Sequence, residues 1–69
     1  MSRNMICWVV MLNRLYLLEW NAGGVKMDLD LQKAFRFLSE RDAAFVAKKI
    51  CGEVVKCRIG IRGVEVIRE

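Results

Sequence analysis

The segment Met5–Leu12 is apolar at every position, and this constrains the fold more than any other feature of the 69-residue chain. Side chains of an extended chain alternate between two faces. Here they form two apolar faces, with Ile6, Trp8, Val10 and Leu12 on one and Met5, Cys7, Val9 and Met11 on the other. A strand with two apolar faces is buried on both sides. A sheet built around this segment therefore needs a covering layer on each face.

A polar pair, Asn13-Arg14, separates this segment from a second one, Leu15–Trp20. Two extended segments around a two-residue break predict a β-hairpin, since Asn tolerates the positive φ that such turns use. Asn21-Ala22-Gly23-Gly24 predicts a further turn, and Val25–Leu29 alternates as an optional third strand would. We therefore expect the first part of the chain to form antiparallel sheet.

The main helix is predicted at about residues 40–51. Ser39 is a favourable N-cap, with Asp42 at the acidic position of a capping box, and Gly52 is expected to supply the left-handed cap. One apolar stripe at helical spacing consists of Ala43, Val46, Ala47 and Ile50. A shorter helical repeat precedes it, made of Leu31, Ala34, Phe35 and Leu38. We expect a helical turn or second helix there.

The C-terminal part predicts one or two strands, Val54–Ile59 and, after Gly60 and Gly63, Val64–Ile67. The whole chain, residues 1–69, is predicted to be a single α+β domain with a small antiparallel sheet. One helix covers only one face of such a sheet, and a chain of this length hardly supplies a second layer. We therefore expect an apolar face of the hairpin to bind a partner or a second copy, forming a homodimer. The expected interface consists of Trp8, Val9, Val10, Met11, Tyr16 and Trp20.

The sequence contains few residues that could carry out catalysis. Histidine is absent, which removes the usual general base at neutral pH. The three cysteines are too few for a structural zinc site and are expected to be reduced and buried. Asp28 and Asp30 could form a carboxylate pair, but a solvated strand face gives the same pattern more often. We expect no catalytic residue, no metal and no cofactor.

The net charge of +4 permits contact with nucleic acid without requiring it. The candidate contacts are Arg14, Lys56, Arg58 and Arg62, diluted by Glu53 and Glu65. The apolar segments are shorter than the roughly 20 residues that cross a bilayer, and no secretory signal is recognised. We therefore expect a cytoplasmic protein that does not bind membranes.

The stretch from Leu29 to Ile59 resembles small orphan proteins of phages and prophages of Gram-positive bacteria. The resemblance rests on Asp30-Leu31-Gln32-Lys33-Ala34, Phe37, Ser39, Asp42-Ala43, Val46-Ala47, Ile50, Gly52 and Val54-Val55-Lys56, preceded by Trp8-Val9-Val10 and Tyr16-Leu17. It implies a hairpin, an N-capped helix and a return strand. The matching residues are core and cap positions, so the resemblance transfers no binding residue.

Characterised proteins of that kind tend to bind and disable a host protein, including the nucleases of CRISPR immunity. The resemblance therefore implies a phage-encoded, non-enzymatic inhibitor of a bacterial defence nuclease, acting in the host cytoplasm by protein–protein contact. The partner would be a CRISPR effector nuclease or its guide RNA complex. Inhibitors that mimic DNA are acidic, and this chain is basic. The alternative function is a small basic nucleic-acid-binding or regulatory accessory protein.

Overall fold

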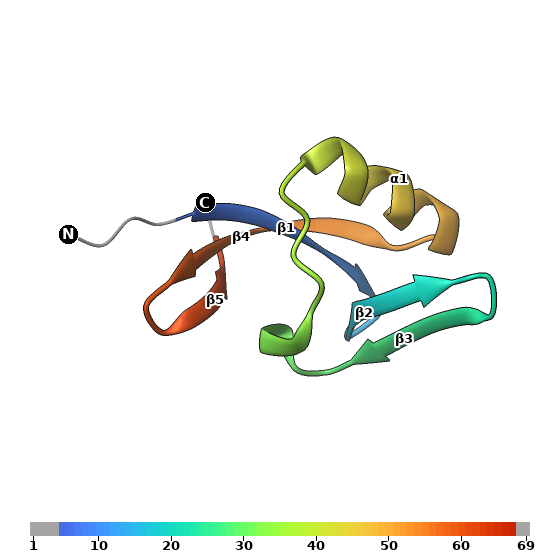
Figure 1. The fold of residues 1–69 in the computed structure, drawn as a ribbon, viewed down its shortest axis with the longest axis horizontal. Coiled ribbons are helices and arrows are strands. Elements are labelled where there is room, and N and C mark those ends of the chain that lie inside the picture. Colours follow the sequence, from blue (N-terminus) through green and yellow to red (C-terminus); the bar gives the residue numbers. More distant parts are fainter. Residues whose placement is uncertain (1–4, 68–69) are drawn as a thin grey trace.

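The computed structural model describes residues 5–67, which form one five-stranded antiparallel sheet and one α-helix. The elements in chain order are β1 (Met5–Leu12), β2 (Leu15–Asn21), β3 (Gly24–Asp28), the 3-10 helix η1 (Leu31–Lys33), α1 (Glu40–Ile50), β4 (Glu53–Gly60) and β5 (Gly63–Val66). The strand order is β3-β2-β1-β4-β5 (Figure 1). The predicted α+β class, third strand and main helix are confirmed. The layout differs from the predicted hairpin, helix and return strand. In the structure, β1 is the central strand, with the β2–β3 hairpin on one side and the β4–β5 hairpin on the other.

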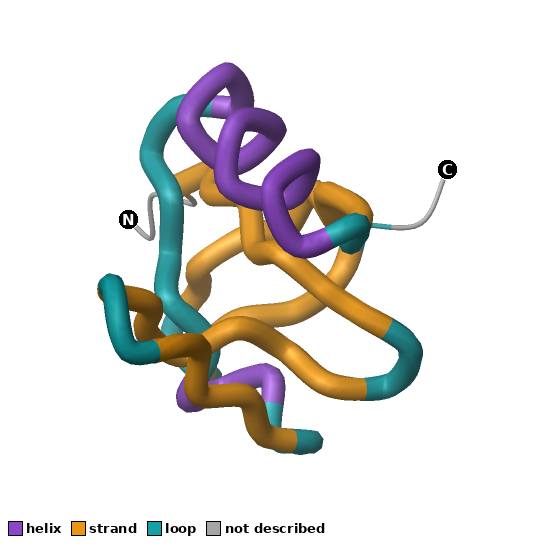
Figure 2. The backbone as a smooth tube through the Cα atoms, turned by 90° about the vertical axis from the view of Figure 1, so that its right-hand side faces the viewer, coloured by secondary structure: helices purple, strands orange, loops and turns teal. Residues whose placement is uncertain are grey.

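The sheet curves instead of lying flat (Figure 2), and the divergence of β1 from β2 is one cause. The two strands pair only beside their turn, at Met11 with Tyr16 and at Leu12 with Leu15. Asn13 in that turn has a φ of 59°, as the sequence predicted. Beyond these pairs, the segment that precedes α1 lies between the diverging strands. Phe37 exchanges two backbone hydrogen bonds of 2.8 Å with Trp8, and Phe35 N donates to Leu17 O at 2.9 Å.

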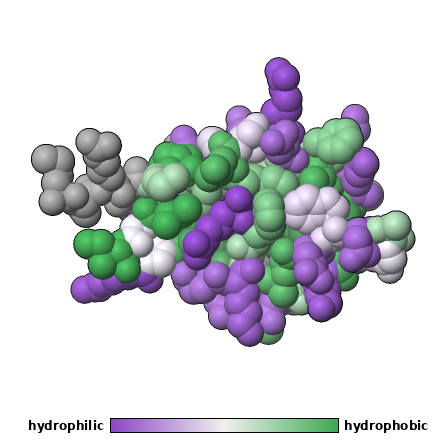
Figure 3. Space-filling model, viewed as in Figure 1, coloured by the Kyte–Doolittle hydropathy of each residue, from purple (hydrophilic) through white to green (hydrophobic). Residues whose placement is uncertain are grey.

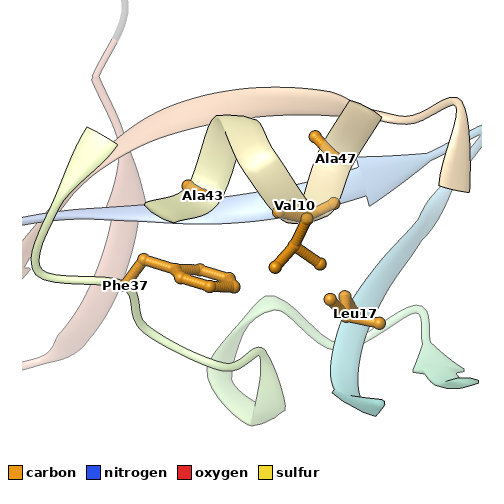
Figure 4. Close-up of a cluster of buried hydrophobic side chains, with 6 residues drawn as sticks. Val10, Leu17, Phe37, Ala43 and Ala47 are labelled. Atoms are coloured by element: carbon orange, nitrogen blue, oxygen red, sulfur yellow. The ribbon is translucent and has the colours of Figure 1, made fainter. Parts of the chain in front are cut away.

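The helix covers one face of the sheet. Its predicted apolar stripe is confirmed, because Ala43, Val46 and Ala47 are buried and the half-buried Ile50 packs beside them. Below them lie Val10 of β1, Leu17 of β2 and the Phe37 ring (Figure 4). Side chains from four separate segments thus meet in this first core.

The second face of the sheet also carries a buried core, built from residues of the chain itself. Cys7 and Val9 of β1 are fully buried on this side, together with Cys57 of β4. Their cover comes from short pieces, namely Leu31 of η1, Ala34, and Val64 and Val66 of β5. These short pieces form the covering layer of the second core.

The outer edge of β5 is closed by one side chain, Gln32 of η1. Its Nε2 donates to Val64 O at 2.6 Å, and its Oε1 accepts from Val64 N at 2.8 Å. The amide thereby replaces the two backbone hydrogen bonds of a neighbouring strand. Gly63, with a φ of 109°, permits this contact, since a Cβ there would overlap Gln32 Oε1. In the part of the chain that the structure describes, β3 is the other edge of the sheet.

The ends of α1 follow the sequence with one correction. Ser39 Oγ accepts from Asp42 N at 3.4 Å, which is the predicted N-cap. The left-handed residue at the C-terminal end is Cys51, with a φ of 60°, and not Gly52. Gly52 is needed for another reason: a Cβ there would lie 2.7 Å from Met11 O of β1. The glycine thus permits the chain to pass closely from helix to sheet.

Replacing Ser39 by Ala should lower the free energy of unfolding by about 1 kcal/mol, because Asp42 N loses its acceptor. Ile50→Ala should cost about 2 kcal/mol, at the low end for a core truncation, since Ile50 is only half-buried. Urea denaturation followed by circular dichroism measures both. Unchanged midpoints in both variants would contradict the assigned start and apolar face of α1.

Candidate functional site

The two carboxylates considered for metal or acid–base chemistry have structural roles. Asp28 Oδ1 accepts from Asp30 N at 2.8 Å, and Asp30 Oδ1 accepts from Gln32 N at 2.9 Å. Each carboxylate thus caps a backbone amide at the turn into η1. Lys33 Nζ lies 3.9 Å from Asp28 Oδ2. Among residues 5–67, no group of three His, Cys, Asp or Glu side chains is placed to hold a metal ion.

The cysteines divide into a buried pair and an exposed thiol, which corrects the expectation that all three are buried. Cys7 and Cys57 face each other across β1 and β4 and are fully buried. Burial raises the pKa of the Cys57 thiol to about 11, and the neighbouring Cys7 adds to the shift. Burial also raises the pKa of Cys7, partly opposed by Arg36. Cys51 is exposed at the end of α1.

Alkylation should therefore distinguish the three thiols. With iodoacetamide at pH 8, the folded protein should gain one adduct quickly, at Cys51, because the thiolate is the reactive form and the other two thiols are protonated and enclosed. Mass spectrometry of the intact protein and of its peptides measures the adducts over time. Urea should expose all three. Fast labelling of Cys7 or Cys57 without urea would contradict the buried pair.

The six residues predicted for a partner interface do not share one exposed face. Val9 and Val10 are fully buried on opposite faces of β1, so the folded chain cannot present them to a partner, and their assignment to an interface is corrected. The half-buried members also contribute to the cores, with Trp8 in the first and Tyr16 in the second. Met11 is half-buried, and Trp8 Nε1 is enclosed without a hydrogen-bond partner among residues 5–67. Of the six predicted interface residues, Trp20 is the exposed one, with 38% of its surface accessible to solvent.

The four basic candidates are spread along the molecule. Arg14 lies in the β1–β2 turn, whereas Arg58 and Arg62 lie in the β4–β5 hairpin beside the start of β1. Lys56 is exposed opposite Trp8, between these two ends. Arg58 is engaged by Glu65, with its Nη2 2.9 Å from Oε1. Only Arg58 and Arg62 meet, at a shallow surface hollow of about 600 Å³.

A second hollow, of about 500 Å³, lies between the helix and the β2–β3 hairpin and is here called the α1–β3 groove. Its lining consists of Trp20, Asn21, Ala22, Val25, Val46, Lys49 and Ile50. In Figure 1, α1 is at the upper right and the β2–β3 hairpin is below it. Trp20 and Val25 are paired across β2 and β3, and Val25 is 46% exposed. The groove therefore offers apolar side chains to solvent from a helix and a sheet together.

Neighbouring aromatic rings hold Trp20 in place. Its ring stacks on Phe37, with centroids 5.3 Å apart and planes 21° apart, and meets Phe35 edge-on at 5.0 Å. Phe35 and Phe37 are themselves in edge contact at 4.8 Å. Phe37 belongs to the first core and is bonded to β1 through its backbone. The indole is thus supported by the core while one side stays open to solvent.

The helix side of the groove carries a cation beside another aromatic ring. Lys49 Nζ lies 4.4 Å from the centroid of the Phe45 ring, an attractive cation–π distance. Phe45 is 63% exposed, although it lies mid-helix. Sequence reasoning did not select Phe45, Val25 or Lys49 as binding residues. The available signal was a phenylalanine on the polar side of the predicted helical stripe.

Three further exposed hydrophobic residues, Met5, Ile6 and Ile61, lie at the opposite end of the molecule, where Ile61 also lines the hollow of Arg58 and Arg62. Figure 3 shows this apolar surface at the left, near β5 and the start of β1. Met5, Ile6 and Ile61 are 53%, 39% and 90% exposed.

Within residues 5–67, no helix has the length and apolar character needed to cross a lipid bilayer. Comparison with known protein families, curated proteins and solved structures finds no significant match to this chain.

Proposed function

We propose that this chain is a non-enzymatic binding protein that acts by protein–protein contact through the α1–β3 groove. The supporting observation is that Trp20, held by two phenylalanine rings, opens onto a groove with an exposed Val25. A supported aromatic side chain at an apolar hollow is typical of an interface anchor. The titratable groups considered for catalysis serve instead as caps or core residues.

The narrower form of the proposal takes its partner from the sequence resemblance. In that form, a phage-encoded inhibitor binds a bacterial defence nuclease, such as a CRISPR effector or its guide RNA complex, in the host cytoplasm. The homodimer likewise stays a prediction, and Met5, Ile6 and Ile61 provide an apolar surface for it outside the groove. Light scattering over a concentration series measures the oligomeric state.

The experiment that tests this function uses purified CRISPR effector complexes and proteins captured from bacterial lysate. Val25→Glu should weaken binding at least about tenfold, equivalent to ~1.4 kcal/mol, because it places a carboxylate among apolar side chains. The matched control is Leu38→Glu, which introduces the same carboxylate at a hydrophobic residue that is 69% exposed and does not line the groove. Nuclease assays then test inhibition. Equal binding by wild type and Val25→Glu would overturn the groove as the binding site.

A nucleic-acid-binding protein is the second candidate, favoured by the hollow that Arg58 and Arg62 line. Binding through phosphates weakens steeply as salt rises. A gel-shift salt series with RNA and DNA therefore distinguishes the candidates. Loss of binding in Arg62→Ala, with Val25→Glu unaffected, would support nucleic acid over protein.

A further inference from the structure

We infer that the occupant of the α1–β3 groove is an apolar peptide segment of a partner protein that carries an acidic residue next to its hydrophobic anchor. This inference rests on the proposed function and deepens it, because it specifies the chemistry of the partner. The anchor fills the hollow beside Trp20 and Val25, and the carboxylate meets the Lys49 ammonium.

The apolar part of the inference follows from the lining. Trp20 and Val25 form the sheet wall, and Val46 and Ile50 form the helix wall. Asn21 Oδ1 already accepts a hydrogen bond from Gly23 N at 2.7 Å, so this acceptor is engaged inside its own turn. The four apolar side chains of the two walls therefore favour an aliphatic or aromatic side chain of the partner, with a polar group beside it.

The acidic part of the inference follows from charge. Lys49 is the charged residue of the lining. Its ammonium lies 4.4 Å from the centroid of the exposed Phe45 ring and has no carboxylate within 4 Å among the described residues, so its charge is not neutralised by an acid. The acids of α1, Glu40 and Asp42, lie in the first turn, away from the groove end of the helix. Lys26 on β3 is already paired with Glu19 at 3.4 Å.

Charge also argues against the other occupants. Two copies of this chain each carry a net charge of +4, so they repel each other on approach. Nucleic acid requires a row of cations along its phosphates, whereas this groove presents one. A net charge of +4 also attracts an acidic partner during approach.

The test uses three synthetic peptides of equal length, built from leucine with glutamate, leucine with lysine, and serine with glutamate. Each is titrated into the ¹⁵N-labelled full chain and followed by NMR. We expect the leucine–glutamate peptide to shift the amides of residues 20–25 and 46–50. It should bind at least about tenfold more tightly than either other peptide.

Two matched variants test the role of Lys49. Lys49→Glu should reverse the order, so that the leucine–lysine peptide binds more tightly than the leucine–glutamate peptide. Lys48→Glu is the control, because Lys48 also lies in the last turn of α1 but does not line the groove. Both variants change the charge near the helix C-terminus equally. Lys48→Glu should therefore keep the wild-type order.

The remaining outcomes separate this inference from the proposed function. Equal binding of both leucine peptides at the groove would overturn the acidic partner and leave the groove as a protein-binding site. Binding of the serine–glutamate peptide as tight as that of leucine–glutamate would overturn the apolar anchor. Absence of groove shifts with every peptide would overturn both proposals. Shifts of the same amides when the protein alone is concentrated would show that a second copy is the occupant.

Discussion

Replacing Val9 or Val10 by Asp is expected to unfold the chain, not merely to separate it from a partner. Both side chains are fully buried, one in each core. An isolated carboxylate in an apolar core costs several kcal/mol, even when its pKa rises so that it becomes neutral. The free energy of unfolding of a chain this small is about 3 to 10 kcal/mol. Circular dichroism and NMR dispersion should show loss of the native signals.

The matched control is Val25→Asp, which introduces the same carboxylate at a strand position that is 46% exposed. This variant should keep the native spectrum, because solvent can hydrate the charge. A native spectrum from Val9→Asp or Val10→Asp, combined with a changed oligomeric state, would refute the two buried cores. It would instead restore the interface that the sequence predicted.

The second large effect is expected from Phe37→Ala, at about 3–5 kcal/mol of unfolding free energy. The Phe37 ring is 5% exposed in the first core and stacks on Trp20, so its removal leaves a cavity and releases the indole. Phe35→Ala on the same segment should cost only about 1 kcal/mol, since that ring is 44% exposed. Urea denaturation followed by tryptophan fluorescence measures both.

The prediction is tested by comparing the unfolding free energies of the Phe37→Ala and Phe35→Ala variants. If both truncations cost the same, then the segment before α1 does not insert its Phe37 ring into the core as described. Phe37→Ala should also shift the native fluorescence of Trp20, because the stacked ring is lost. An unchanged native spectrum would contradict that stacking.

Local patterns predicted the secondary structure well, because each rests on neighbouring residues. The Ser39 cap, the Ala43–Ile50 stripe and the Asn13 turn all act within a few positions. The second covering layer was missed because it is assembled from distant short pieces. Leu31, Ala34 and Val64 are too scattered in sequence to be recognised as one surface. The interface prediction failed at Val9 and Val10 for this reason.

The candidate site was less predictable than the fold. Trp20 was selected from the sequence, yet the groove depends on how far the β2–β3 hairpin bends toward α1. The register between Leu17 and Glu19 shifts at an irregularity in β2, which sets the face that Trp20 occupies. No alternation rule locates such a shift in advance, because it breaks the period of two on which the rule depends.

The Gln32 amide that closes the β5 edge also has a consequence for how the chain folds. This contact joins residues 32 positions apart, and the Trp8–Phe37 backbone pair likewise joins the first strand to the middle of the chain. The β1–β4 pairing also joins distant residues, from Met5 with Ile59 to Met11 with Glu53. Loop closure must therefore precede most of the stabilising contacts, which slows folding relative to a helical protein of the same size. Pairing between distant segments, and not formation of the local hairpin turns, is therefore expected to limit the folding rate.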